Sequence, residues 1–158
     1  MSIQTSIKKI KQSCQLDDTA LSTFPVDETV ITISVQMLIP SVTILLEEDI
    51  WHLSTITCQQ IEEEIILLYH FWEKKGLTLR LSLDSQFPKV DSLTALIPGA
   101  EFYEREVHEM FGVEFIGLQN TAPLLLPDDW EGGYPLRENA HASVSSNHNK
   151  KKKKGESS

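Results

Sequence analysis

Apolar and polar residues alternate without exception over residues 77–83, and this segment constrains the fold more than any other. A period of two is typical of a β-strand with one buried face and one exposed face. Gly76 precedes the segment and can supply the positive φ that a hairpin turn needs. Residues 61–75 carry apolar residues at helical spacing, but a strand that follows a glycine turn usually pairs with the residues before it. We therefore expect strands at 64–72 and 77–83, joined by a turn at 73–76.

Helix and strand patterns are mixed in the rest of the chain up to residue 116. β-Branched residues are frequent at 29–37, which predicts a strand. Short helices are expected at 1–16, 41–49 and 91–97, a further strand at 50–58, and a linker at 17–24. Together with the hairpin, these segments predict an α+β domain over residues 1–116, with a small mixed β-sheet and helices packed on one face.

Residues 101–112 have the pattern of an amphipathic helix. One apolar stripe is formed by Tyr103, Val107, Met110 and Phe111. Arg105 has carboxylates one turn away in both directions, at Glu101 and Glu109, which favours two i,i+4 ion pairs. Gly112 stands where a helix C-cap is expected, and residues 113–115 resemble a short strand.

Residues 117–140 are rich in proline and glycine and show no helical or strand period, so we expect an extended, irregular arm. Its apolar residues are Leu124, Leu125, Leu126, Trp130, Tyr134 and Leu136. An apolar load of this size must be buried against the domain or against a partner. We expect the leucines to hold the arm to the domain. Trp130, Tyr134 and Arg137 belong to the residue types that dominate interface hot spots, and we expect them to face a partner.

The charge of the chain argues against nucleic acid as a partner. Residues 1–149 carry nine Lys and Arg against twenty-two Asp and Glu, a balance of −13. Five lysines at 150–154 and Glu156 bring the total to −9. An acidic body of this kind repels phosphate backbones. Residues 141–158, rich in Ser, Asn, His and Lys, are expected to form a disordered, lysine-rich tail.

The sequence offers no candidate for a cofactor or a metal. Cys14 and Cys58 are isolated, whereas an iron–sulfur cluster normally takes about four thiolates. His108-Glu109 begins like a metalloprotease motif, but position 112 is glycine instead of the second histidine. The seven glycines form no phosphate-binding loop. No signal peptide is recognised and the longest apolar run, 65–69, is too short to span a bilayer, so we expect a cytoplasmic protein.

Two segments of the chain resemble a known family. They read YEREVHEMFG at 103–112 and LPDDWEGGYPLR at 126–137. Together they are similar to the signature of the 30-kilodalton subunit of respiratory complex I and of the related subunit of membrane-bound, energy-converting nickel-iron hydrogenases. The similarity runs from about residue 61 to 137. It implies a partner interface at Glu104, Arg105, Glu106, Glu109, Trp130, Tyr134 and Arg137.

The resemblance also implies a function. A subunit of this kind is a cofactor-free assembly subunit in the hydrophilic arm of a membrane-bound oxidoreductase, peripheral to the cytoplasmic membrane and in contact with lipid only indirectly. Its partners are the large subunit, of the quinone-site or nickel-iron type, and the iron–sulfur subunits. Complex I members usually follow the helix with glycine-histidine-proline and basic residues. Residues 117–123 lack the histidine and the basic residues, which favours the hydrogenase branch over an NADH-quinone oxidoreductase subunit.

Two alternatives come from other classes of protein. The first is a free-standing soluble enzyme that uses Glu104, Arg105, Glu106 and His108 at a cleft. Catalytic activity of the purified chain without partners would favour it. The second is an adaptor held at an anionic surface by lysines 150–154. A solvated tail is the more common role of such a charge run.

Overall fold

The computed structural model describes residues 3–24 and 28–138 of the chain. The helices are α1 (Ile3–Cys14), α2 (Leu38–Glu47) and α3 (Ala100–Phe111), with 3₁₀ turns η1 (Asp18–Ala20) and η2 (Val35–Met37). The strands are β1 (Leu21–Phe24), β2 (Glu28–Thr32), β3 (Leu53–Ile61), β4 (Glu64–Trp72), β5 (Gly76–Asp84), β6 (Lys89–Asp91) and β7 (Glu114–Ile116). This content confirms the expected α+β class.

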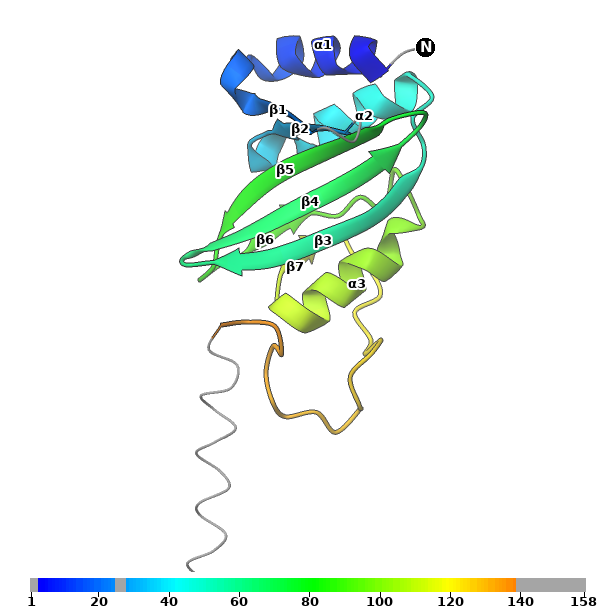
Figure 1. Ribbon diagram of the computed structural model, residues 1–158. Coiled ribbons are helices and arrows are strands. Elements are labelled where there is room, and N and C mark those ends of the chain that lie inside the picture. The colour runs from blue at the N-terminus through cyan, green and yellow to red at the C-terminus, as the bar shows by residue number, and fades with distance from the viewer. Residues whose placement is uncertain (1–2, 25–27, 139–158) are drawn as a thin grey trace, which may run out of the picture.

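Five strands form one mixed sheet in the order β1-β2-β5-β4-β3 (Figure 1). The hairpin β4–β5 is antiparallel with Trp72 opposite Gly76, so the expected strands and their turn are confirmed. β3 continues the antiparallel pairing on the outer side of β4, and β2 runs parallel to β5. A second, two-stranded sheet pairs β6 with β7 in parallel.

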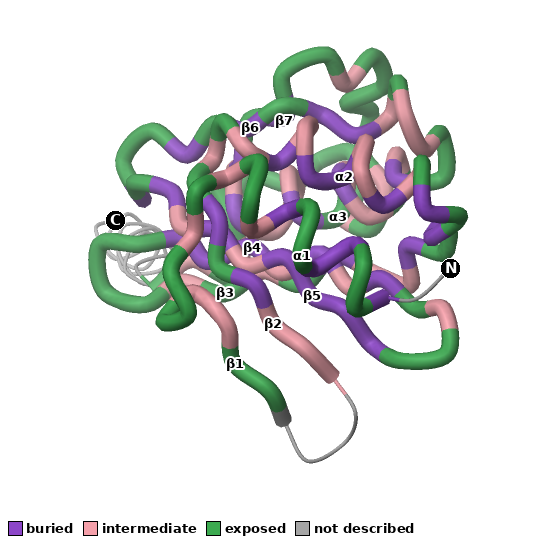
Figure 2. Tube along the Cα trace, turned by 90° about the horizontal axis from the view of Figure 1, so that it is seen from above, coloured by how far each residue is buried: buried purple, intermediate pink, exposed green. Residues whose placement is uncertain are grey.

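The alternation at 77–83 decides which face of the sheet is covered. Leu77, Leu79, Leu81 and Leu83 are all buried, opposite Phe71, Tyr69, Leu67 and Ile65 of β4. α2, α3 and the β6–β7 pair lie on this side of the sheet, as the view from above shows (Figure 2). α1 packs against α2 through Ile3, Ile7 and Ile10, which recur at helical spacing. The expectation of helices on one face is therefore confirmed.

Several boundaries differ from the sequence-based expectation because tertiary contacts override local patterns. Residues 21–24 are strand β1 and not linker, since they pair with β2 at the sheet edge. β2 ends at Thr32, before the η2 turn. α2 begins at Leu38, so Pro40 lies inside the first turn, where its missing N–H is not needed. β3 starts at Leu53, later than expected, because the Ile50 N–H still bonds to the Leu45 carbonyl of α2.

The expected helix at 91–97 is wrong. Lys89–Asp91 forms β6, in which Val90 is buried opposite Phe115 of β7. Asp91 is thus used in a strand and not as a helix cap, and residues 94–96 form a turn. Pairing with a strand that lies far away in sequence gives Val90 a buried position that a short helix would not provide.

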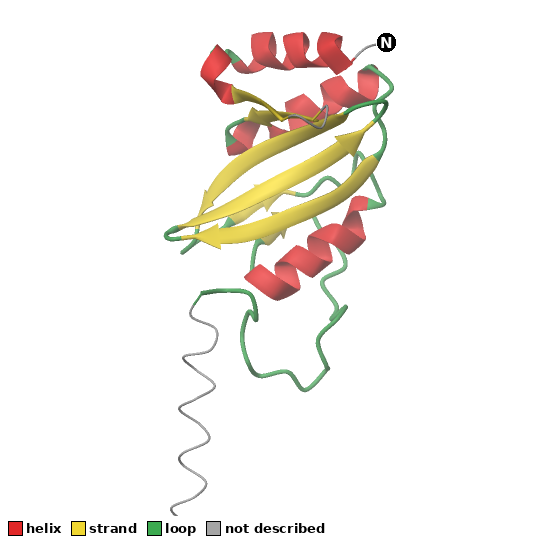
Figure 3. Ribbon diagram, viewed as in Figure 1, coloured by secondary structure: helices red, strands yellow, loops and turns green. Residues whose placement is uncertain are grey.

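Residues 117–138 form neither helix nor strand, as expected for the arm, and they follow a loop below α3 (Figure 3). Residues 139–140 of the expected arm and the expected disordered tail at 141–158 lie outside the described residues. Among the helices that the structure describes, none is long and apolar enough to cross a membrane.

Candidate functional site

α3 has one face in the core of the domain and another in contact with the arm. Val107 and Phe111 are buried with the sheet residues, and Gly112 ends the helix with φ of 71°. This left-handed cap confirms the expected helix end. Tyr103 and Met110, from the expected stripe, are half-buried at its edge.

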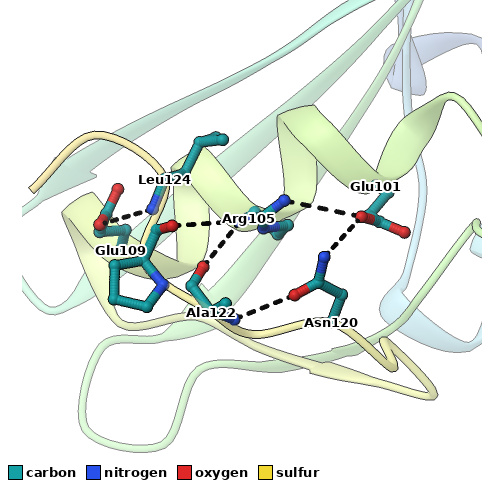
Figure 4. Close-up of polar contacts among 7 residues, drawn as sticks. Glu101, Arg105, Glu109, Asn120, Ala122 and Leu124 are labelled. Carbon is teal, nitrogen blue, oxygen red and sulfur yellow. Dashed lines mark hydrogen bonds and ion pairs between the residues drawn. The ribbon is translucent and has the colours of Figure 1, made fainter.

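Arg105 holds the first part of the arm. Its guanidinium donates to the carbonyl oxygens of Ala122 (2.9 Å) and Pro123 (3.2 Å) (Figure 4). It also lies 3.6 Å from a Glu101 carboxylate oxygen, which confirms one of the two expected ion pairs. Asn120 donates to the same Glu101 oxygen (3.0 Å) and accepts from the Ala122 N–H (3.2 Å). Only 11% of the Arg105 side chain is exposed, so the arm covers most of it.

Glu109 holds the next part of the arm. Its carboxylate accepts the backbone N–H groups of Leu124 (3.1 Å), Leu125 (2.8 Å) and Leu126 (3.0 Å). Burial by itself raises the pKa of Glu109, but these three N–H groups and the charge of Arg105 outweigh it, and the pKa lies below its usual value. The second acid expected to pair with Arg105 thus uses its oxygens on the arm backbone.

The end of the arm returns to the C-terminus of α3. The Leu136 N–H donates to the Met110 carbonyl (3.1 Å). Arg137 donates to the carbonyl oxygens of Phe111 (2.6 Å) and Ser85 (2.6 Å). Its guanidinium also lies 5.9 Å from the centroid of the Tyr134 ring. Arg137 therefore joins the arm, α3 and the segment after β5, and its hydrogen bonds are made within the chain.

The leucines do not anchor the arm as the sequence suggested. Leu125 is 58% exposed and Leu136 is 56% exposed, while Leu124 and Leu126 are half-buried. The arm is held by charged side chains on its backbone instead, because an extended segment without a partner strand leaves its N–H and C=O groups free to be bonded. Leu125 and Leu136 are left facing outward.

The two aromatic residues of the arm are fixed against glycines. The Trp130 Nε1 donates to the Gly133 carbonyl (2.7 Å), and its ring lies so close to Gly132 that an added Cβ would be 2.4 Å away. The Tyr134 ring lies on Gly112, where an added Cβ would be 2.3 Å from its Cε2. Trp130 is nevertheless 44% exposed and Tyr134 45% exposed. Both rings are thus immobilised by contacts on one side and open on the other.

Between α3 and the arm lies a hollow of about 500 Å³, which we call the arm hollow. Arg105, His108 and Glu109 line it from the helix, and residues between Thr121 and Tyr134 line it from the arm, among them Asp128, Trp130 and Glu131. The structure therefore brings together five of the expected interface residues around this part of the chain: Arg105, Glu109, Trp130 and Tyr134 line the hollow, and Arg137 contacts Tyr134.

Two expected interface residues lie apart from the hollow. Glu106 is exposed on α3, whereas Glu104 is completely buried. The Glu104 carboxylate accepts the Ser92 hydroxyl (2.6 Å) and the Leu93 N–H (2.6 Å). Burial raises the pKa of Glu104 in spite of these bonds. The signal was present in the sequence, because Glu104 shares a helix face with Ala100, Val107 and Phe111 at spacings of three and four.

Of the residues expected in the alternative of a free-standing enzyme, Arg105 and His108 line the arm hollow, whereas Glu104 is buried and Glu106 is exposed outside it. The Glu104 carboxylate is bonded to Ser92, Arg105 to the arm, and His108 Nδ1 donates to the Val113 carbonyl (2.8 Å). These groups thus have three different hydrogen-bond partners within the chain. In the part of the chain that the structure describes, no three or more His, Cys, Asp or Glu residues gather as a metal site. Burial raises the pKa of the Cys58 thiol to about 12, and the nearby charge of Arg137 only partly offsets this, so Cys58 is not a reactive thiolate.

Comparison with known proteins supports the family resemblance that α3 and the arm indicate. Residues 31–145 match the family described as the 30 kDa subunit of the respiratory-chain NADH dehydrogenase. This match covers more than half of the chain. The chain belongs to this family. The resemblance inferred from residues 103–112 and 126–137 is thereby confirmed, and the 30 kDa subunit family is one of subunits of complex I-related assemblies.

Curated relatives of the 30 kDa subunit family match half of the chain. Over 80 residues, 49% of this chain, it is 40% identical to the C subunit of NADH-quinone oxidoreductase from Roseiflexus sp. strain RS-1, of which the match covers 45%. The C subunit of the same oxidoreductase from Moorella thermoacetica is also 40% identical over 80 residues, which is 53% of that protein. The matched part thus spans about half the length of these relatives.

Two solved structures share the fold. One is a chain in the structure of the membrane-bound sulfane sulfur reductase, an archaeal respiratory membrane complex, with a TM-score of 0.73 and 23% identity over 92% of this chain and 91% of that one. The other is a trypsin-resistant fragment of Nqo5, with a TM-score of 0.64 and 15% identity over 76% of this chain and 99% of the fragment. The arrangement of sheet and helices is therefore shared with these two chains at low sequence identity.

Proposed function

We propose that this chain is a structural and assembly subunit, without a cofactor, in the hydrophilic arm of a complex I-related membrane-bound oxidoreductase. The observation that carries the proposal is the arm itself. An exposed aromatic surface is held rigidly to α3 by charged side chains, in a chain that belongs to the 30 kDa subunit family. Exposed and immobilised aromatic residues are typical of interface hot spots.

We propose the large subunit of the complex as the partner of this surface, with the iron–sulfur subunits nearby. Among the expected interface residues, Glu106, Trp130 and Tyr134 have exposed side chains that can contact it. Arg105, Glu109 and Arg137 contribute by holding the arm in place. Glu104 is buried within the domain and joins α3 to Ser92 and Leu93. The chain would reach the cytoplasmic side of the membrane only through the complex.

Among the branches of this superfamily, we propose the NADH-quinone oxidoreductase type first. The identity of 40% to the C subunits of two bacterial NADH-quinone oxidoreductases supports this branch. The hydrogenase-type branch is the second candidate, and the observation that favours it is the segment 117–123, which lacks the histidine and basic residues usual in complex I members.

Co-purification tests this function. The chain carries an affinity tag and is produced together with the products of its neighbouring reading frames, and mass spectrometry identifies the proteins retained with it. We expect a large subunit to be retained. The identity of that subunit, with nickel ligands or with a quinone site, decides the branch. A chain that elutes alone under these conditions, or that catalyses a reaction alone, would contradict the proposal.

The contribution of the arm is tested with one substitution. Trp130→Ala should reduce the retained large subunit strongly, because truncation of a central hot-spot residue costs about 2–4 kcal/mol of binding free energy. Trp51→Ala is the matched control, since Trp51 is also exposed but precedes β3, outside α3 and the arm. Equal losses in both variants would show that the arm is not the interface.

A further inference from the structure

The arm hollow is shaped before any partner binds. Trp130 is fixed by its hydrogen bond to Gly133 and its packing on Gly132, and Tyr134 is fixed on Gly112. The backbone N–H of Trp130 also closes a turn on the Pro127 carbonyl (3.0 Å). A site whose aromatic walls are already ordered loses little conformational entropy when it is filled.

The charge that remains available in the hollow is negative. Glu109 is compensated by three backbone N–H groups and by the neighbouring Arg105. Asp128 and Glu131 also line the hollow, and neither carboxylate has a hydrogen bond or an ion pair among the residues that the structure describes. An occupant of the hollow therefore meets two uncompensated carboxylates beside an indole ring.

We propose that the arm hollow receives a basic side chain, arginine or lysine, of the large subunit. This inference rests on the proposed function and names the chemistry of the contact. A cation over the face of a tryptophan is attracted by the ring, and Trp is the best of the aromatic residues for this contact. Tyr134 is less available, because Arg137 already lies 5.9 Å from its centroid. The cation is placed between Trp130 and the carboxylates of Asp128 and Glu131.

The test uses the co-purified complex and a matched pair of neighbouring acids. In Asp128→Lys/Glu131→Lys, the repulsion of the incoming cation should reduce the retained large subunit about tenfold or more. Asp129→Lys is the control, because Asp129 is exposed next to Asp128 but does not line the hollow. Retention by the control should be unchanged. Thermal melting of each isolated variant shows that the chain still folds.

The outcomes separate this inference from the proposed function. If the unsubstituted chain retains no large subunit, the proposed function fails. If the unsubstituted chain and the double variant retain the large subunit equally, the proposed function stands, but the inference that a basic side chain occupies the hollow is wrong. Equal losses in the double variant and in Asp129→Lys would also overturn the inference, since the effect would come from general charge and not from the hollow.

A crosslink identifies the occupant. Asp129→benzoylphenylalanine places a photoreactive group beside the hollow without removing either carboxylate, and the complex is irradiated and digested for mass spectrometry. We expect a crosslink within a few residues of an arginine or lysine of the large subunit. A crosslink to lysines 150–154 of this chain would overturn the inference, because the occupant would be the chain's own tail.

Discussion

Glu104 is a residue whose position is predicted wrongly when only its charge is considered, because its carboxylate is buried. Its oxygens accept two hydrogen bonds of 2.6 Å from Ser92 and Leu93, so it links α3 to the segment after β6. A charged residue type usually indicates a surface position, yet paired acids do occur in cores. Here the spacing from Val107 and Phe111 is a better guide to its position than its charge.

The pH dependence of stability should reveal this carboxylate. Burial raises the pKa of Glu104, so the folded chain binds the proton more tightly than the unfolded chain does. Its contribution to the free energy of unfolding is fully present below the usual pKa of 4.5 and is lost as the pH rises through the folded pKa. Urea unfolding as a function of pH should therefore show that the free energy of unfolding of Glu104→Gln increases relative to that of the natural chain as the pH rises.

Glu106→Gln serves as the control for this measurement, because Glu106 is exposed on the same helix. It should change little at any pH. A difference between Glu104→Gln and the natural chain that stays constant with pH would contradict the assigned burial. Below pH 4.5, Glu104→Ala should lower the free energy of unfolding by about 1–3 kcal/mol, since it leaves the buried Leu93 N–H without an acceptor.

Gly112 has two reasons to be glycine. Its φ of 71° disfavours other residues, and a Cβ would lie 2.3 Å from Tyr134. Gly112→Ala should lower the free energy of unfolding by about 1–2 kcal/mol from the backbone alone. It should also displace Tyr134 and expose the arm to limited proteolysis. Gly99→Ala is the control, because no atom lies within 4 Å of its added Cβ and its φ is −65°. Equal proteolysis of both variants would contradict the contact with Tyr134.

At the scale of elements, α3 acts as a support with two functional sides. One side fills the core, and the other uses Arg105 and Glu109 to hold an arm that has no strand partner of its own (Figure 4). This arrangement explains why i,i+4 charges on α3 occur together with an irregular proline-rich segment. The charged side chains bond the N–H and C=O groups of the arm, which would otherwise be bonded by a neighbouring strand.

Amide hydrogen exchange should measure how firmly Glu109 holds the arm. In Glu109→Gln, the amide N–H2 group faces one of the N–H donors of the arm, so exchange at Leu124, Leu125 and Leu126 should accelerate about tenfold or more. In the natural chain, protection should be present above pH 4.5 and decline as the pH falls through the lowered pKa of Glu109. Exchange rates in Glu106→Gln should match those of the natural chain. If Glu109→Gln leaves the three amides equally protected, the tether is not formed in solution.

On the scale of the whole molecule, Arg137 joins parts of the chain that lie far apart in sequence. It bonds the carbonyl groups that follow β5 and end α3, at Ser85 and Phe111, while it belongs to the arm. Its position makes the arm part of the domain and not a free extension. The outward-facing aromatic residues keep their places because both ends of the arm are fixed.

Arg137→Ala should therefore lower the stability of the isolated chain, by about 1–3 kcal/mol, the range for hydrogen bonds to charged groups. Urea unfolding measures this loss. Arg80→Ala is the control, since the half-buried Arg80 side chain makes no hydrogen bond or ion pair among the described residues. An unchanged midpoint in Arg137→Ala would show that the arm is held without this residue.

The sequence by itself determined the hairpin, α3 and the family. The alternation at 77–83 and the stripe on α3 are local patterns, and each one specifies which side chains face the core once the element forms. The two signature segments were enough to predict the family, because their residues and order are specific in combination. The two patterns depend on residues that lie within a few turns or one strand of each other, and the signature can be read directly from the order of its residues.

Only the tertiary structure decided β6, the hydrogen-bond partners of Glu104 and the way the arm is held. β6 exists because Val90 meets Phe115, and Glu104 is buried because Ser92 and Leu93 come to meet it. The arm leucines were expected inside, but Glu109 and Arg137 bond its backbone and leave Leu125 and Leu136 exposed. Each of these contacts joins residues more than ten positions apart, and no local pattern encodes which distant group will satisfy a hydrogen bond or fill a buried position.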